Sequence, residues 1–166
     1  NLISQLPFFE EYFSIFDSKN LKSEEKISAL SKYEKLEAAL VLGIKDYFRK
    51  LNFKTATLGL SGGIDSALTL ALAVKALGKK NVFPILMPSQ FSSDHSISDS
   101  VALCENLGCD YYTIEIEKIY KSFDKELTDL FKGTEFGIAE ENIQSRIRGT
   151  LLMAQTNKFG SILLNT

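Results

Sequence analysis

The sequence predicts an α/β fold, a doubly wound parallel sheet with helices on both faces. Short apolar segments that favour strands alternate along the chain with longer segments of helical character, as in successive βαβ units. One of these strands runs through two adjacent glycines directly into a helix, and parallel sheets place their ligand sites at such turns. The chain has 166 residues, 45% of them hydrophobic, which is enough for one core of ordinary size.

The first part of the chain, residues 1–22, is expected to be an extended lead-in. It is rich in aromatic side chains such as Phe8 and Phe13, which need a surface to cover, either in this domain or in a neighbouring one. A helix is expected next, at Ser23–Leu51, because apolar residues recur there near helical spacing with Lys and Glu between them. We therefore place the folded domain at residues 23–166.

The remaining elements alternate between strand and helix. Apolar, β-leaning runs predict four strands, at Thr55–Leu60, Val82–Met87, Tyr111–Ile116 and Ser161–Asn165. The stretches between them predict helices at Ser66–Leu77, Ser98–Leu107, Ile119–Phe131 and Ile138–Asn157. Parallel strands joined by helices are the arrangement that this alternation favours.

Composition excludes several classes of function. A formal net charge of −2 and a pI near 5.5 provide no basic surface for nucleic acid. No apolar run is long enough for a membrane span, and the N-terminus is not signal-like. We therefore expect a cytoplasmic protein that binds neither nucleic acid nor a membrane. The two cysteines, Cys104 and Cys109, match no metal motif, and we interpret them as reduced structural thiols.

The most informative motif is the segment 61–66, which reads Ser-Gly-Gly-Ile-Asp-Ser. Glycines let the backbone approach an anion, and the free N–H groups at a helix N-terminus favour phosphate oxygens. The segment lacks the Lys of a Walker A loop and the spaced glycines of a dinucleotide fingerprint. We expect it to hold ATP, with Ser61 and Ser66 donating to phosphate oxygens. The alternative is an ordinary turn with Asp65 or Ser66 as the helix N-cap.

The carboxylate of Asp65 is expected to bind a cation. Like charges repel, so a carboxylate beside a phosphate site is explained if Mg²⁺ lies between them. We therefore expect Asp65 to be a magnesium ligand.

The end of the chain is expected to reach the same site. In a doubly wound sheet, ligands bind beyond the carboxyl ends of the strands, where the strand order reverses. If the first and fourth strands are neighbours, the glycine loop and residues 165–166 meet at that point. Thr166 would then lie inside the nucleotide site, and a chain ending there is expected to be a truncated domain.

A second dense segment, residues 138–154, is expected to be an amphipathic helix. Asn142 and Arg146 are four residues apart, share one face and could present an amide and a guanidinium to a phosphate or carboxylate. Arg148 points elsewhere on the helix. The alternative is a solvated helix face with Glu–Arg pairs.

Two family resemblances follow from these segments. The glycine loop resembles the signature of the N-type ATP pyrophosphatases, which split ATP between the α- and β-phosphates. The Asn142…Arg146 segment, the strand ending in Asn165-Thr166, and Met87-Pro88-Ser89 with the serines after it resemble NAD synthetase. The segment at residues 39–47, which precedes the first predicted strand, looks like the glutamine-dependent branch of that family. The resemblance covers residues 32–166 and implies the adenine-nucleotide alpha-hydrolase-like fold.

The resemblance implies a ligase that amidates nicotinic acid adenine dinucleotide (deamido-NAD). The substrate carboxylate attacks the α-phosphorus of ATP, pyrophosphate leaves, ammonia attacks the acyl-adenylate and AMP departs. Glutamine would supply the ammonia through an upstream nitrilase-like glutaminase domain, and paired synthetase domains would make a homo-oligomer. The family continues past the last residue with further site residues, so this piece alone is expected to be nearly inactive.

The resemblance also implies roles for individual residues. Asn142 and Arg146 would bind deamido-NAD, and Asp65 would ligate Mg²⁺. His95, in the serine-rich loop after the second strand, has no assigned role. The ATP site would comprise Gly59, Leu60, Ser61, Gly62, Gly63, Ile64, Asp65, Ser66 and Thr166, with Leu86 and Met87 near the adenine.

Other functions remain open at this stage. A GMP synthetase shares the glycine loop but should lack the Asn142…Arg146 segment. A tRNA-thiolating enzyme would need catalytic cysteines and a basic surface. An ammonia-only NAD synthetase is a close variant, and a non-catalytic nucleotide-binding module belongs to a different class.

Overall fold

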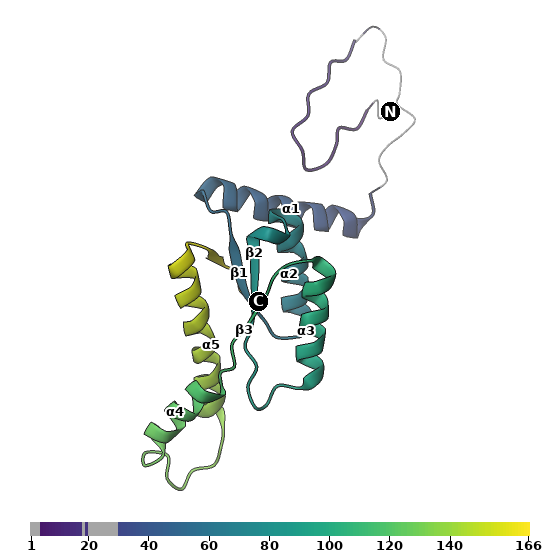
Figure 1. Cartoon of the computed structure of the whole chain (residues 1–166). Helices are drawn as coiled ribbons and strands as arrows, with labels where there is room; N and C mark the ends of the chain where they lie inside the picture. The colour runs from purple at the N-terminus through teal and green to yellow at the C-terminus, as the bar shows by residue number, and fades with distance from the viewer. Residues whose placement is uncertain (1–3, 18, 20–29) are drawn as a thin grey trace.

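The computed structural model describes residues 4–17, 19 and 30–166. Its sheet has four parallel strands in the order β3-β2-β1-β4 (Figure 1). The strands are β1 (Ala56–Leu60), β2 (Val82–Leu86), β3 (Tyr112–Thr113) and β4 (Ile162–Leu163). The helices are α1 (Lys32–Leu51), α2 (Ile64–Leu77), α3 (Asp94–Leu107), α4 (Glu117–Leu127) and α5 (Ile138–Phe159), with a short 3₁₀ turn at Lys79–Asn81.

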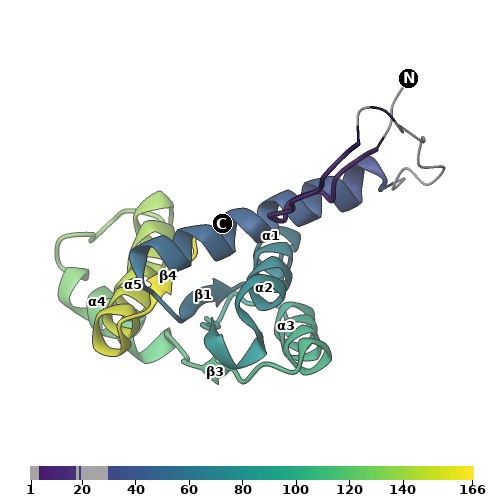
Figure 2. The same cartoon turned by 90° about the horizontal axis from the view of Figure 1, so that it is seen from above.

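Helices cover both faces of the sheet, which confirms the predicted fold class. α2 and α3 lie on one face and α4 and α5 on the other, while α1 packs on α2 across the top of the molecule (Figures 1 and 2). Side chains alternate across a strand, so β2 sends Leu86 into a core under α2 and α3. Ile85 and the following Met87 enter a second core under α4 and α5.

The central strand β1 is almost fully enclosed. It pairs with β2 from Ala56 to Leu60 and with β4 at Ala56 and Thr57. The hydroxyl of Thr57, itself completely buried, donates to the carbonyl of Phe83 at 2.7 Å, so the polar group is satisfied within the sheet. The strands first and fourth in sequence are therefore neighbours, as the switch-point argument required.

The helix α1 begins at Lys32, later than the predicted start at Ser23. Residues 20–29 lie outside the described part of the chain, and Leu30 and Ser31 are not helical. Ser31 is the N-cap: its hydroxyl accepts from the N–H of Glu34 at 3.3 Å, and the Glu34 carboxylate accepts from the Ser31 N–H at 2.7 Å. This capping box satisfies two backbone donors and defines the helix start.

The other boundaries differ from the prediction for local reasons. α3 begins at Asp94 rather than Ser98, because the Ser93 hydroxyl caps it by accepting from the N–H of Ser96 at 3.2 Å. His95 therefore lies in the first turn of a helix and not in a loop. β3 and β4 are two residues long each, shorter than predicted, and they form the two edges of the sheet.

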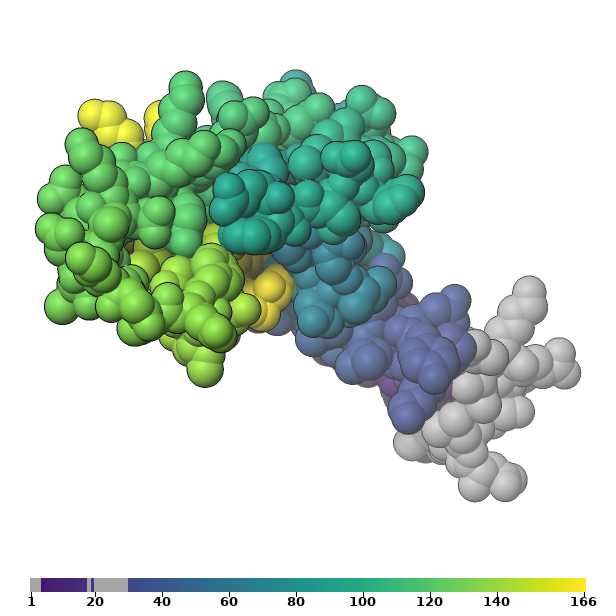
Figure 3. Space-filling model, turned by 90° about the horizontal axis from the view of Figure 1, so that it is seen from below, coloured from purple at the N-terminus to yellow at the C-terminus, as the bar shows by residue number. Residues whose placement is uncertain are grey.

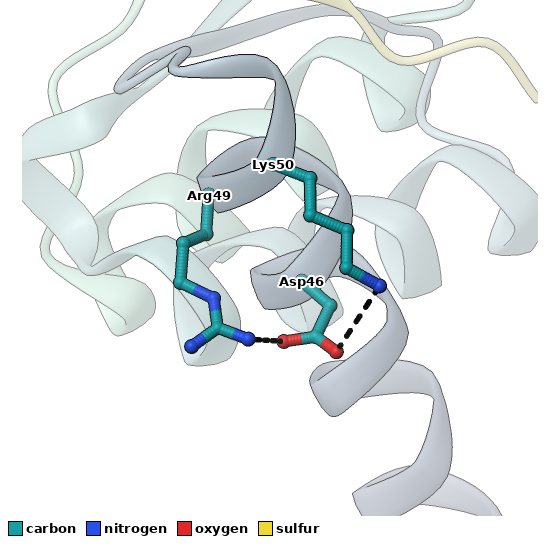
Figure 4. A network of polar contacts seen from close by, with 3 residues as sticks. All are labelled: Asp46, Arg49 and Lys50. Carbon is teal, nitrogen blue, oxygen red and sulfur yellow. Dashed lines mark hydrogen bonds and ion pairs between the residues drawn. The ribbon is translucent and has the colours of Figure 1, made fainter.

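The last turn of α1 carries an exposed charge network, drawn in Figure 4. Arg49 donates to the Asp46 carboxylate at 3.0 Å, and the ammonium of Lys50 lies 3.9 Å from its other oxygen. Exposed pairs of this kind contribute between about 0 and 1 kcal/mol each. Basic residues at a helix C-terminus also complement the helix dipole, so the network supports the end of α1 without controlling the fold.

The described part of the lead-in packs on α1 with some of its aromatic residues. The ammonium of Lys35 lies 4.6 Å from the ring centre of Phe8, and Phe8 and Phe9 border a shallow hollow against α1. Phe13 and Ile15 remain 81% and 84% exposed. Packing within this chain therefore accounts for only part of the apolar lead-in. The described helices include none that is both long and apolar enough to cross a membrane.

The two cysteines are free and buried in the core under α2 and α3. The thiol of Cys109 donates to the carbonyl of Cys104 at 3.7 Å. Burial, followed by the neighbouring Cys109 thiol, raises the pKa of the Cys104 thiol from 9.0 to about 12. These features agree with the structural role inferred from the sequence.

Leu70→Ala should lower the free energy of unfolding by about 2–5 kcal/mol, because it opens a cavity in the core. Leu70 is 0% exposed, whereas Leu68 on the same helix is 56% exposed and provides the matched control. Urea unfolding followed by circular dichroism would compare the two alanine variants. Equal losses for both would contradict this account of the core.

At pH 8 the native protein should resist iodoacetamide at both cysteines, and the unfolded protein should react. The thiolate is the nucleophile, and the folded state raises the pKa of both thiols. The folded state thus retains a proton that the unfolded state releases, so Cys104 contributes stability that is present below pH 9 and is lost as pH rises toward 12. Mass spectrometry after labelling measures the effect, and rapid native labelling would contradict it.

Candidate functional site

A cleft of about 550 Å³ opens at the carboxyl ends of β1, β2 and β4. Figure 3 looks onto this edge, and the yellow end of the chain shows between the yellow-green atoms of α5 and the blue atoms of the segment near β1. Three loops, the first turns of α3 and one face of α5 form its walls. The lining residues are Gly59, Leu60, Ser61, Leu86, Met87, Pro88, Ser92, Ser96, Ile97, Ser100, Ser145, Arg148, Gly149, Leu152, Leu164, Asn165 and Thr166.

The glycine loop is held by its own serines. The hydroxyl of the buried Ser66 donates to the carbonyl of Gly63 at 2.9 Å and accepts from the N–H of Ser61 at 3.3 Å. The two serine hydroxyls lie 3.1 Å apart, and only Ser61 lines the cleft. Gly63, not Asp65 or Ser66, is the N-cap of α2 and has no side-chain cap. The first N–H groups of α2 are therefore left without a capping side chain.

Gly62 allows the loop to touch the first turn of α3. Its φ is +81°, a conformation that favours glycine, and a Cβ there would lie 2.5 Å from the carbonyl oxygen of Ser96. The same contact brings Ser96 and Ser100 to the cleft wall. The requirement for glycine at this position is thus steric on two counts.

The end of β4 supplies the opposite wall. The N–H of Leu164 donates to the carbonyl of Thr57 at 2.8 Å, which fixes the register of the last strand against β1. Asn165 and Thr166 follow directly and line the cleft, as do Gly59 and Leu60 of β1 and Ser61 at the start of the glycine loop, whereas residues 62–66 do not line it. Of the residues predicted for ATP, Gly59, Leu60, Ser61, Leu86, Met87 and Thr166 line this cleft together.

α5 faces the cleft with a residue set that sequence reasoning missed. Ser145, Arg148, Gly149 and Leu152 line it, and their spacing of three, four and seven residues is the signal that could have identified them. Arg148 is half-buried, and its Nε–H donates to the carbonyl of Met87 at 3.1 Å. Burial lowers the pKa of this guanidinium, although an arginine stays charged in proteins.

Asn142 and Arg146 are exposed and do not line the cleft. Arg146 borders a separate apolar hollow of about 310 Å³ between α4 and α5, beside Phe123. The predicted role of the two residues in deamido-NAD binding stays a prediction. The alternative of Glu–Arg pairs along α5 finds no support, because none of the ion pairs among the described residues lies on that helix.

Asp65 lies exposed in the first turn of α2, beside the glycine loop. Among the described residues, no group of three or more His, Cys, Asp or Glu side chains lies close enough together to hold a metal ion. Asp65 does not line the cleft. A single carboxylate beside the glycine loop fits Mg²⁺ held jointly by the protein and a phosphate ligand, which is how this ion usually binds, and the role of Asp65 as a magnesium ligand stays a prediction. His95 is exposed on α3 and does not line the cleft.

Gly62→Ala should destabilise the protein by about 1–3 kcal/mol and displace the loop, because it adds a clash to an unfavourable φ. Gly149→Ala is the control: its Cβ meets no atom within 4 Å, and Ala in a helix is favoured over Gly by about 1 kcal/mol. Thermal unfolding should separate the two variants in opposite directions. A Gly62→Ala protein as stable as the parent would contradict the described loop contact.

Comparison with known proteins agrees with this geometry. A family model described as NAD synthase matches residues 36–166. A glutamine-dependent NAD(+) synthetase from Synechocystis sp. is 52% identical over 99% of this chain, which corresponds to 30% of that protein. The chain spans less than a third of the length of its most similar curated relatives, from 23% to 31%.

Solved structures show the same likeness. The glutamine-dependent NAD+ synthetase of Acinetobacter baumannii, in complex with ADP, superimposes with a TM-score of 0.85 and 39% identity over 91% of this chain and 29% of that one. The NH3-dependent NAD synthetase of Campylobacter jejuni, in complex with nitrate, gives a TM-score of 0.73 and 32% identity over 82% of this chain and 57% of that one. On the match of sequence, fold and glycine loop, the chain belongs to the NAD synthase family.

Proposed function

We propose that residues 23–166 form the ATP-handling part of a glutamine-dependent NAD synthetase. The observation that carries this proposal is that Ser61, at the start of the glycine loop, lines a cleft of about 550 Å³ in a chain 52% identical to a glutamine-dependent NAD(+) synthetase. The bound ADP of the Acinetobacter relative supports nucleotide binding. These likenesses favour this function over a GMP synthetase or a non-catalytic module.

The proposed reaction forms an amide in two steps. A carboxylate oxygen of deamido-NAD attacks the α-phosphorus of ATP, and the bond to the β-phosphate oxygen breaks to release pyrophosphate. Ammonia then attacks the acyl carbon, loses a proton and expels AMP, which leaves NAD. Activation is needed because a carboxylate is a poor acyl donor, whereas AMP is a good leaving group.

The chain contributes mainly positioning and charge stabilisation to this reaction. The backbone N–H groups at the start of α2, with the hydroxyl of Ser61, would hold the departing pyrophosphate. Leu86 and Met87, at the end of β2, would seat the adenine, and Thr166 would contact the nucleotide from β4. Asp65 would hold Mg²⁺, which when bound offsets phosphate charge.

The remaining partners are part of the same proposal. Deamido-NAD would extend to Asn142 and Arg146, where exposed polar groups border the apolar hollow between α4 and α5. An upstream nitrilase-like glutaminase would supply ammonia, and the length of the relatives supports such an additional part. We further infer paired synthetase domains in a homo-oligomer and a cytoplasmic location, in which free buried cysteines are stable.

The full-length protein, given Mg²⁺, ATP and deamido-NAD with ammonium or glutamine, should form NAD, AMP and pyrophosphate in equal amounts. Chromatography separates the products. Asp65→Asn should lower the rate at least about tenfold, because loss of a metal ligand removes charge stabilisation worth several kcal/mol. Asp46→Asn removes one exposed carboxylate from α1 and should leave the rate unchanged.

Two outcomes would contradict the proposal. A folded, ATP-binding protein that forms no NAD with either nitrogen source would overturn the substrate. Turnover with ammonium but never with glutamine would overturn the glutamine-dependent branch and favour the ammonia-only variant.

A further inference from the structure

Arg148 is held in one orientation at the cleft wall. Its Nε–H donates to the Met87 carbonyl at 3.1 Å, at the end of β2. A guanidinium carries five N–H donors, so four remain on its two outer nitrogens. No hydrogen bond from these nitrogens to another described residue is found. The planar group is therefore anchored at its base, with its outer donors available to a ligand.

The charge of Arg148 has no partner in the described part of the chain. The ion pairs found there involve Arg49, Lys50, Lys75 and Lys121. A partly buried cation without a counter-ion costs free energy, because burial removes its hydration without replacing it. An anion from outside the chain would offset that cost.

The cleft composition points to the same occupant. Arg148 is the single charged side chain among the described residues that line it, and the other polar lining groups are hydroxyls and the amide of Asn165. Hydroxyls, an amide and one cation can all donate to oxyanions, and the described lining residues include no carboxylate side chain to repel them. The cleft is therefore electrostatically suited to an anion rather than to a neutral or cationic ligand.

We propose that the outer nitrogens of Arg148 bind the α-phosphate of the adenine nucleotide, the phosphate at which the reaction takes place. This assignment rests on the proposed function for the identity of the nucleotide. The anchor on Met87 places the guanidinium beside the expected adenine seat, and the α-phosphate is the phosphate nearest the adenosine. The glycine loop would then hold the outer phosphates while Arg148 neutralises charge at the reacting phosphorus.

The test compares AMP with adenosine, which differ by that one phosphate. In the full-length protein, titration calorimetry should show that Arg148→Gln weakens AMP binding about tenfold or more, as expected for loss of a charge-assisted hydrogen bond. Adenosine binding should change less than about threefold, which is within the effect of a neutral contact. Lys158→Gln, which removes one exposed charge from the same helix, should change neither affinity.

Two further measurements exclude a merely structural role. Arg148→Lys keeps a positive charge but loses the fork geometry, so its AMP affinity should lie between those of the parent and Arg148→Gln. The ligand-free melting temperature of Arg148→Gln should change little, because loss of the hydrogen bond to Met87 opposes the removal of an unpaired, partly buried charge. The increase in melting temperature that AMP produces in the parent should be lost.

Specific results would overturn the assignment. Equal weakening of AMP and adenosine would mean that Arg148 only shapes the end of β2. Unchanged AMP affinity, with a raised KM for deamido-NAD, would assign the guanidinium to the substrate carboxylate instead. If the unsubstituted protein still forms NAD, either result leaves the proposed function intact. A parent that binds no adenine nucleotide would overturn the function together with this assignment.

Discussion

The pairing of β1 with a parallel strand on each side is the constraint on which the rest of this structure depends. Both ladders run in the same direction, so the chain leaves β1, β2 and β4 at one edge of the sheet. Ser61 at the start of the glycine loop, Met87 and Thr166, far apart in sequence, therefore converge on one cleft. The buried hydroxyl of Thr57, bonded to Phe83, shows how closely the central strand is accommodated within the sheet.

The cleft is built from donors more than from charges. The serine hydroxyls shape the glycine loop and the start of α3, while the uncapped N-terminus of α2 leaves backbone N–H groups available. A single guanidinium supplies the one formal charge among the described lining residues. Such a site can distribute the charge of a polyphosphate over many fixed dipoles, with little reorganisation during a reaction.

α5 borders two different hollows with its two sides. Arg148 and Gly149 face the cleft, whereas Arg146 borders the apolar hollow against α4. The two arginines are two residues apart, so a helix turns them to well-separated directions. One helix can thus serve a nucleotide on one side and a second substrate or a second protein surface on the other, and a family match alone does not distinguish these sides.

Periodicity and turn chemistry in the sequence were enough to determine the α/β class, the order of the elements and the glycine loop. The adjacency of the first and last strands was only a condition of the sequence argument, and the pairing of β1 with β4 supplied it. They also contained the capping box at Ser31, a local signal that sets the start of α1. Tertiary structure alone decided that the hydroxyl of Ser66 donates within the glycine loop, to the carbonyl of Gly63. It also decided that Arg148, rather than Arg146, faces the cleft. Local patterns report the neighbours of a residue along the chain, whereas the direction of a side chain depends on which helix face packs against the sheet.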